Sequence, residues 1–263
     1  MNTSEHDAYL CEVLLAPIQK CKVYKPAFGQ ANSTGLSLTD FQILYGQDLF
    51  YSWLGLDDAS VYAAHKAAGG LTSVYRQLGI GSERLFRAVI GICLELSEQQ
   101  MNWHYIYNKP AGRTGRHTLD ACIKLADLNE DARRRFVAWL ETIGGSSSPT
   151  AKLEGVVFEV RQGYKSADSK RQNADLRYGV RAYQAGLLPA FAIMSSQVSD
   201  PVIKRYRHDG MLVLTGIDDN TPTKSTFAFF KTVVGYDLAY FFKRNAGYLK
   251  GQIHNVVQTL LNP

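Results

Sequence analysis

The 263-residue chain lacks the marks of several common protein classes. No apolar stretch approaches about 18 residues, so no segment is expected to span a membrane, and no basic start followed by an apolar run indicates a signal peptide. None of the four cysteines forms a C-x-x-C pair or has a histidine at a zinc-ligand interval; they are Cys11, Cys21, Cys93 and Cys122. We therefore expect a cytoplasmic protein with free thiols and no membrane partner.

Three enzyme signatures are also missing. The chain has no phosphate-binding Walker loop and no dinucleotide-binding fingerprint, and Ser195-Ser196 lacks the Gly-x-Ser-x-Gly context of a hydrolase nucleophile. What remains is a mildly basic chain, with a formal net charge of +5, which is compatible with a polyanionic partner.

The charges are most informative between residues 150 and 186. This stretch holds seven basic residues and four acids: Lys152, Arg161, Lys165, Lys170, Arg171, Arg177, Arg181, Glu154, Glu159, Asp168 and Asp175. A surface that only binds phosphate would carry few acids. Interleaved acids and cations are expected where carboxylates hold a metal cation beside a phosphate group.

Hydrophobic periodicity predicts a helical N-terminal region, residues 1–145, belonging to the same domain as the rest. Helices are expected at 5–16, 41–53, 58–68 and 82–94, with Thr118 and Asn129 each capping one more, whereas 101–107 could form a strand. The Gly/Ser-rich segment 144–150 is the clearest linker. After it, residues 150–263 predict a strand at 156–160, a helix at 168–185, strands at 188–194 and 211–215, and two helices at 225–243 and 246–261. The fold class is therefore α+β.

One strand carries the residues that point to chemistry. Glu159 lies near its end and Arg161 follows two residues later, so both side chains project from the same face. A carboxylate is a suitable ligand for Mg²⁺, which prefers oxygen donors. A neighbouring cation can stabilise the charge that develops on a phosphate during hydrolysis.

This strand, the polar helix after it and the next apolar strand together resemble the core of the PD-(D/E)xK nuclease superfamily. The run YKSADSKRQNAD (164–175) is similar to type II restriction endonucleases, and to the polar helix of those that cut sites containing CCGG. The resemblance covers roughly residues 150–240 and does not reach the first half of the chain. It implies a restriction-endonuclease-like core, in which a small central mixed sheet is flanked by helices.

The sequence departs from that family at two positions. The family usually has lysine two residues after the strand acid, where this chain has Arg161; because arginine does not lose its proton, Lys165 is the better candidate for a base. The family's first metal-binding acid usually follows proline, and no Pro-Asp pair occurs here. Glu154 is our first choice for that acid, paired with Glu159 as metal ligand. Asp120 and Asp175 are the alternatives.

The helix after the strand is expected to face DNA. Its apolar side is expected to consist of Leu176, Val180 and Tyr183, which leaves a row of hydrogen-bond donors on the other side. Donors of this kind contact phosphates or read base edges. The candidate DNA-binding residues are Ser169, Lys170, Arg171, Gln172, Asn173, Arg177 and Arg181, with Arg113 and Arg116 of the basic loop 109–117.

The combined expectation is a restriction endonuclease that hydrolyses double-stranded DNA at a specific site with Mg²⁺. Because two strands of a palindrome must be cut, we expect a homodimer or a higher homo-oligomer. Two alternatives remain open. One is a non-catalytic DNA-binding or interaction module, which Arg161 in place of lysine favours, and the other is a hydrolase acting on RNA or a nucleotide.

Overall fold

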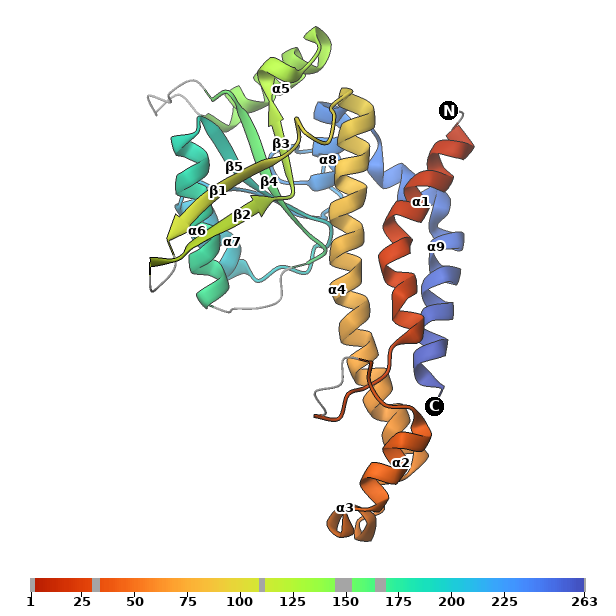
Figure 1. Ribbon diagram of the computed structural model, residues 1–263. Helices are drawn as coiled ribbons and strands as arrows, with labels where there is room; N and C mark the ends of the chain where they lie inside the picture. The colour runs from red at the N-terminus through yellow and green to blue at the C-terminus, as the bar shows by residue number, and fades with distance from the viewer. Residues whose placement is uncertain (1–2, 30–33, 109–111, 145–152, 164–168, 263) are drawn as a thin grey trace. The chain divides into compact units, whose positions relative to one another are not determined.

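The computed structural model describes residues 3–29, 34–108, 112–144, 153–163 and 169–262 (Figure 1). The chain divides into two compact units. Unit 1 comprises Met1–Gly81 and Arg244–Pro263, and unit 2 comprises the intervening Ser82–Lys243. This division differs from the one expected at residues 145–150, because a strand before that segment pairs with a strand after it. The protein is mixed α and β, as expected.

Unit 1 is helical within its described residues. It contains α1 (Thr3–Gln19), a 3-10 turn (Lys20–Val23), α2 (Leu38–Gly46), α3 (Leu49–Trp53), the first part of α4 (Ala59–Leu94) and most of α9 (Leu238–Leu261). Its core joins residues from both ends of the chain: Leu15, Ile18, Cys21, Val74, Val256 and Leu260. Apolar burial across this large sequence separation is what holds α9 to the first 81 residues.

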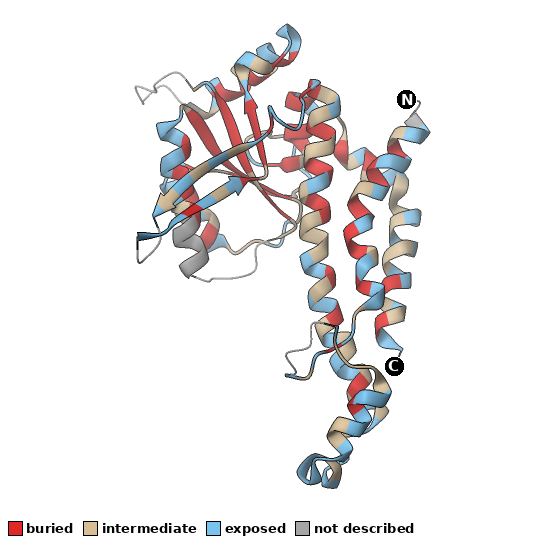
Figure 2. Ribbon diagram, in the orientation of Figure 1, coloured by how far each residue is buried: buried red, intermediate tan, exposed pale blue. Residues whose placement is uncertain are grey.

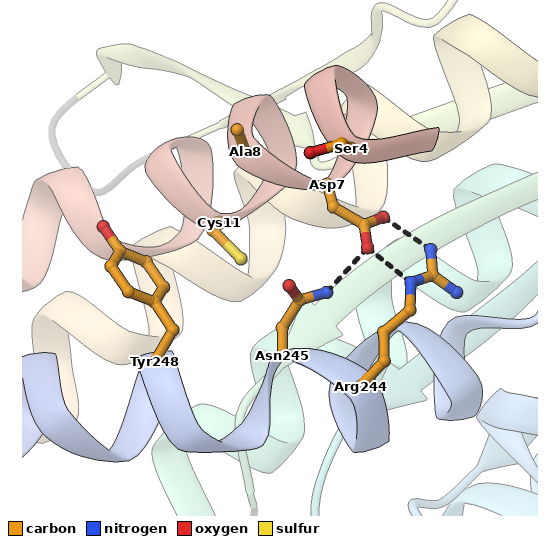
Figure 3. A pocket seen from close by; sticks show the side chains of 7 residues that line it. All are labelled: Ser4, Asp7, Ala8, Cys11, Arg244, Asn245 and Tyr248. Carbon is orange, nitrogen blue, oxygen red and sulfur yellow. Dashed lines mark hydrogen bonds and ion pairs between the residues drawn. The ribbon is translucent and has the colours of Figure 1, made fainter. Parts of the chain in front are cut away.

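A partly buried ion pair also joins α1 to α9 in unit 1. Asp7 accepts hydrogen bonds from the guanidinium of Arg244 and, at 3.0 Å, from the side-chain amide of Asn245 (Figure 3). The hydrogen bonds from Arg244 hold the pKa of Asp7 below its usual value. These residues line a pocket of about 690 Å³, whose polar groups are largely engaged with one another.

α4 is a single 36-residue helix rather than the two helices expected at 58–68 and 82–94. Gly69 and Gly70, which follow the first expected helix, both lie inside α4. A Cβ atom on Gly69 would come within 2.1 Å of the Tyr24 hydroxyl, and one on Gly70 within 2.5 Å of Leu260. Glycine is needed here for close packing rather than for a turn. Ser82, where the second helix was expected to begin, also lies inside α4.

Unit 2 is built around a four-stranded sheet in the order β3 (Ala121–Lys124), β4 (Gly155–Arg161), β5 (Leu187–Ile193), β6 (Leu212–Leu214). β3 is antiparallel to β4, and β4, β5 and β6 are parallel to one another. A separate hairpin pairs β1 (Trp103–Asn108) with β2 (Thr114–Leu119). β1, β4, β5 and β6 confirm the strands expected near these positions. Thr118 lies in β2, so the helix expected after it is wrong.

Helices cover both faces of this sheet (Figure 1). On one face, α6 (Ser169–Gln184), α7 (Asp200–His208) and the β1–β2 hairpin contribute to a core that contains Val157 and Phe191. On the other face, Phe158 packs against Phe86 of α4 and Phe229 of α8 (Thr226–Phe229). Alternate residues of β4 thus enter opposite cores, which is why the strand is buried along almost its whole length (Figure 2).

The remaining elements of unit 2 are α5 (Glu130–Gly144), a 3-10 turn (Leu125–Asp127) and a π-helical turn (Phe230–Val234). Asn129 caps α5 as expected, accepting a 2.9 Å hydrogen bond from the Ala132 N–H. The helix expected at 225–243 is interrupted at Gly235, whose φ of 92° is a left-handed conformation that favours glycine.

Candidate active site

Glu159 and Arg161 lie in the C-terminal half of β4, on the face that carries α6. Arg161 is almost fully buried. Its guanidinium lies 2.8 Å from Asp175 Oδ1 and 3.3 Å from Glu159 Oε1, and 5.1 Å from the ring centre of Phe191. The hydroxyl of Tyr206 donates a 2.5 Å hydrogen bond to the other oxygen of Asp175. Arg161 therefore forms ion pairs with two carboxylates and links β4 to α6.

Asp120 lies beside the same part of β4, in the single residue between β2 and β3. Its backbone N–H donates to the Phe158 carbonyl at 3.1 Å, and its Oδ2 accepts a 2.6 Å hydrogen bond from the Val160 N–H. Burial, together with the negative charges of Glu159 and Glu83, raises the pKa of Asp120 to about 8. Burial also raises the pKa of Glu83, which lies on α4.

Burial is the largest cause of the raised pKa of Asp120, and the negative charges of Glu159 and Glu83 add to it. Like-charged carboxyl groups that are held together disfavour ionisation, unless a proton or a cation compensates them. Two carboxylates with oxygen donors fit Mg²⁺, which prefers a few carboxylate ligands and keeps several waters. In the described part of the chain, no group of three or more His, Cys, Asp and Glu residues has the arrangement of a metal site. The candidate site is therefore a pair, Asp120 and Glu159.

Glu154, the first choice to share a metal with Glu159, is not brought near it. It precedes β4 and is exposed, and its backbone N–H and carbonyl pair with Gly186 and Leu125, each at 2.8 Å. A strand rises about 3.3 Å per residue, so the five positions from Glu154 to Glu159 span roughly 16 Å. Asp120 replaces Glu154 in the pair. Asp175, the other alternative, instead binds Arg161.

Lys165 lies outside the described residues. Ser169, Lys170, Arg171, Gln172 and Asn173 form the first turns of α6, as expected, but their side chains also lie outside the described part of the structure. Their predicted contacts with DNA remain predictions.

The side of α6 that packs on the sheet differs from the one expected. Val180 and Tyr183 were expected to be buried, yet they are 60% and 41% exposed. The buried residues recur at 3-4 spacing one position away: Asp175, Tyr178, Gly179 and Ala182. Tyr178 determines this rotation, because its hydroxyl donates a 2.9 Å hydrogen bond to the Ala190 carbonyl of β5. Gly179 permits Met211 to approach closely.

Four other predicted DNA-binding residues are described, and all four belong to unit 2. Arg177 and Arg181 are exposed on α6. Arg113 is exposed just before β2, and Arg116 lies on β2 with a nitrogen 3.2 Å from the Nδ1 of His104. Exposed arginines of this kind are suitable for contact with phosphate, which does not require burial.

Sequence analysis missed Glu83 and Tyr206 as parts of this site. Glu83 belongs to an unbroken helix, and Tyr206 falls on α7, far along the chain from β4. Only the fold brings Glu83 and Tyr206 close to β4, and no spacing in the sequence indicates either residue.

Comparison with models of protein families, with characterised proteins and with solved structures gave no match to this chain. Separately, no helix in the described residues has the length and apolar character needed to cross a membrane.

Proposed function

We propose that this protein is a Mg²⁺-dependent endonuclease that hydrolyses double-stranded DNA at a specific site. One observation carries the proposal: Asp120 is held by a backbone hydrogen bond against β4 beside Glu159, where its pKa is raised to about 8. Such a pair is stable in its charged form when a divalent cation lies between the carboxylates.

Asp120 and Glu159 would hold the metal, with oxygen ligands supplied by both side chains. A bound Mg²⁺ supplies charge neutralisation at the phosphate and activation of water. Arg161 positions Glu159 through an ion pair, and its guanidinium is itself held by a second ion pair with Asp175. The exposed arginines of α6 and of the hairpin would bind the DNA backbone, and the first turns of α6 would contact base edges.

The test compares Asp120→Asn and Glu159→Gln with Glu154→Gln on plasmid DNA in Mg²⁺. Removing one ligand costs several kcal/mol of transition-state stabilisation, which corresponds to at least about a hundredfold in rate. Glu154→Gln is the matched control, since it removes a carboxylate just before the other end of β4 and should cleave like the wild type. Equal loss of cleavage in all three variants, or in none, would remove the carboxylate pair from the chemistry.

A non-catalytic DNA-binding module is the second candidate, and one observation favours it. Arg161 is committed to a buried ion pair and cannot act as a base. If this candidate is correct, the wild-type protein binds duplex DNA but leaves it intact at every Mg²⁺ concentration. Competition between duplex DNA and RNA for binding separates both candidates from a hydrolase that acts on RNA.

A further inference from the structure

The short helix α3 in unit 1 presents a continuous apolar surface to solvent. Four large side chains are exposed by 65%, 63%, 77% and 59%: Leu49, Phe50, Trp53 and Leu54. We call these four residues the α3 patch. Leu49, Phe50 and Trp53 belong to α3, in which Leu49 and Trp53 lie one above the other at i and i+4, and Leu54 is the C-cap residue. Figure 2 shows α3 as exposed over most of its length.

This helix is well formed despite its five residues. At its start, the Asp48 side chain accepts hydrogen bonds from the N–H groups of Phe50 and Tyr51, at 3.0 and 3.2 Å. At its end, Gly55 has φ of 69°, and the N–H of Leu56 donates to the Tyr51 carbonyl at 2.9 Å, which is a Schellman arrangement. The backbone that carries the patch is therefore ordered before any partner binds, which lowers the entropic cost of binding.

The opposite side of α3 already has its packing partner. Tyr51 stacks on Tyr45 of α2, with ring centres 4.8 Å apart, and Tyr45 in turn lies against Phe41. Tyr51 thus links α3 to α2 by ring stacking, although it is itself 37% exposed, whereas Phe50 and Trp53 are exposed by more than half.

The chemistry around the patch excludes a polyanion as its partner. Residues 37–65 contain four acids, Asp40, Asp48, Asp57 and Asp58, and no lysine or arginine. Phosphate groups of DNA or of an anionic membrane would be repelled by this rim. A protein surface is the remaining class of partner, and exposed Trp and Phe are the residues most enriched at the centres of protein interfaces.

The size of the patch matches what a dimer needs. Its exposed fractions correspond to roughly 600 Å² of mostly apolar surface, at the top of the range found on monomers. Two such patches together would bury roughly 1,200 Å², which is the lower end of the range for a stable interface. A helix face can pack against its own copy about a twofold axis, because such an interface is self-complementary.

We infer that the α3 patch is the surface through which two copies of this chain associate. The inference rests on the patch alone and does not depend on the proposed nuclease chemistry. Since the rims of both copies are acidic, apolar contact must drive the association against charge repulsion. Added salt should therefore strengthen the dimer, the reverse of what ion pairing would produce.

The test is sedimentation equilibrium of the full chain across micromolar concentrations. The wild type should be a dimer, and Trp53→Lys should raise the dissociation constant at least tenfold, as expected for loss of an interface hot spot. Val180→Lys is the matched control, since Val180 is a 60% exposed apolar residue on α6 of unit 2, and it should dimerise like the wild type.

Circular dichroism and thermal unfolding check that Trp53→Lys folds normally, and Leu49→Ser with Phe50→Ser provides a second disruption of the same patch. A wild type that stays monomeric at about 100 μM overturns the inference, and so do patch variants that dimerise normally or a dimer weakened by salt. The plasmid assay is read separately. A dimer that does not cut DNA contradicts only the proposed function, and a cleaving monomer contradicts only this inference.

Discussion

Asp120 accepts a 2.6 Å hydrogen bond from the backbone N–H of Val160. The two residues lie 40 positions apart in the sequence. Asp120 lies between β2 and β3, and this hydrogen bond fixes its carboxylate against β4, one residue after Glu159. The hydrogen bond favours the charged form of Asp120, but burial and the neighbouring carboxylates outweigh it, so the pKa rises to about 8. When the site holds neither a proton nor a cation, repulsion between the ionised carboxylates destabilises the folded protein.

The first prediction concerns stability and pH. In the unfolded chain the pKa of Asp120 is near its ordinary value of 3.8, whereas in the folded protein it is about 8. The folded state therefore binds more protons between these values, and the free energy of unfolding of the metal-free protein should fall as pH rises from about 4 to about 8. Thermal unfolding at a series of pH values in EDTA measures this.

Asp120→Asn should flatten that pH profile and raise the melting temperature of the metal-free protein at pH 8 by about 2–8 °C. Glu154→Gln should keep the wild-type profile. In Mg²⁺ the wild type should gain stability and Asp120→Asn should gain little. Identical profiles for wild type and Asp120→Asn would show that Asp120 does not destabilise the metal-free protein.

The second prediction concerns Arg161. Arg161→Ala leaves Glu159 and Asp175 without the guanidinium between them, and breaking a buried ion pair from one side costs about 3–5 kcal/mol. Arg161→Lys retains the charge but loses the planar contacts, so it should cost less. Denaturant unfolding measures both, with Arg181→Ala on the exposed side of α6 as control, expected within about 0.5 kcal/mol of wild type. A cost below about 1 kcal/mol for Arg161→Ala would contradict the structural role.

The third prediction concerns the hydroxyl of Tyr206, which donates to Asp175 in the core. Tyr206→Phe leaves the ring in place but removes a donor from a charged acceptor, and should cost about 1–3 kcal/mol in the free energy of unfolding. Tyr183→Phe is the matched control. It removes a hydroxyl whose bond to the Gly210 carbonyl is exposed, so water replaces it and the cost should be smaller. Equal costs for the two variants would argue against a buried network.

The fourth prediction concerns DNA binding by exposed arginines. Alanine at Arg113, Arg116, Arg177 or Arg181 should weaken binding to all duplex sequences alike. Removing one arginine–phosphate interaction should lower the slope of log K against log salt by about one. Fluorescence anisotropy at several NaCl concentrations measures the slope, with Arg134→Ala on α5 as control, because its ion pairs with Glu130 and Asp131 already occupy it. An unchanged slope in all four variants would show that these arginines do not contact DNA.

Local patterns predicted the elements near the candidate site well. The apolar run of β4, the periodicity of α6 and the buried β5 are all confirmed, because each depends on residues next to one another in sequence. The prediction of Thr118 as a helix cap was wrong because a strand residue and a cap can have the same local sequence. Gly69 and Gly70 were misassigned because their neighbours Tyr24 and Leu260 are distant in the chain.

The site itself depended on long-range contacts that spacing does not report. Glu154 and Asp120 were both candidates for the acid beside Glu159. Only the antiparallel register of β3 against β4, in which Ala121 lies opposite Phe158, favours Asp120. The buried side of α6 was misplaced because the Tyr178 hydroxyl finds an acceptor on β5, and a tyrosine's preference for burial does not reveal its partner.

The discontinuity of unit 1 has a consequence for the order of events during synthesis. Ser82–Lys243 emerges from the ribosome complete, so unit 2 has every residue it needs to fold early. Leu15 and Val74 must wait for Val256 and Leu260, and closing so long a loop is slow compared with local helix formation. A chain truncated after residue 243 and released from the ribosome should therefore fold its sheet but leave the early helices open to proteolysis.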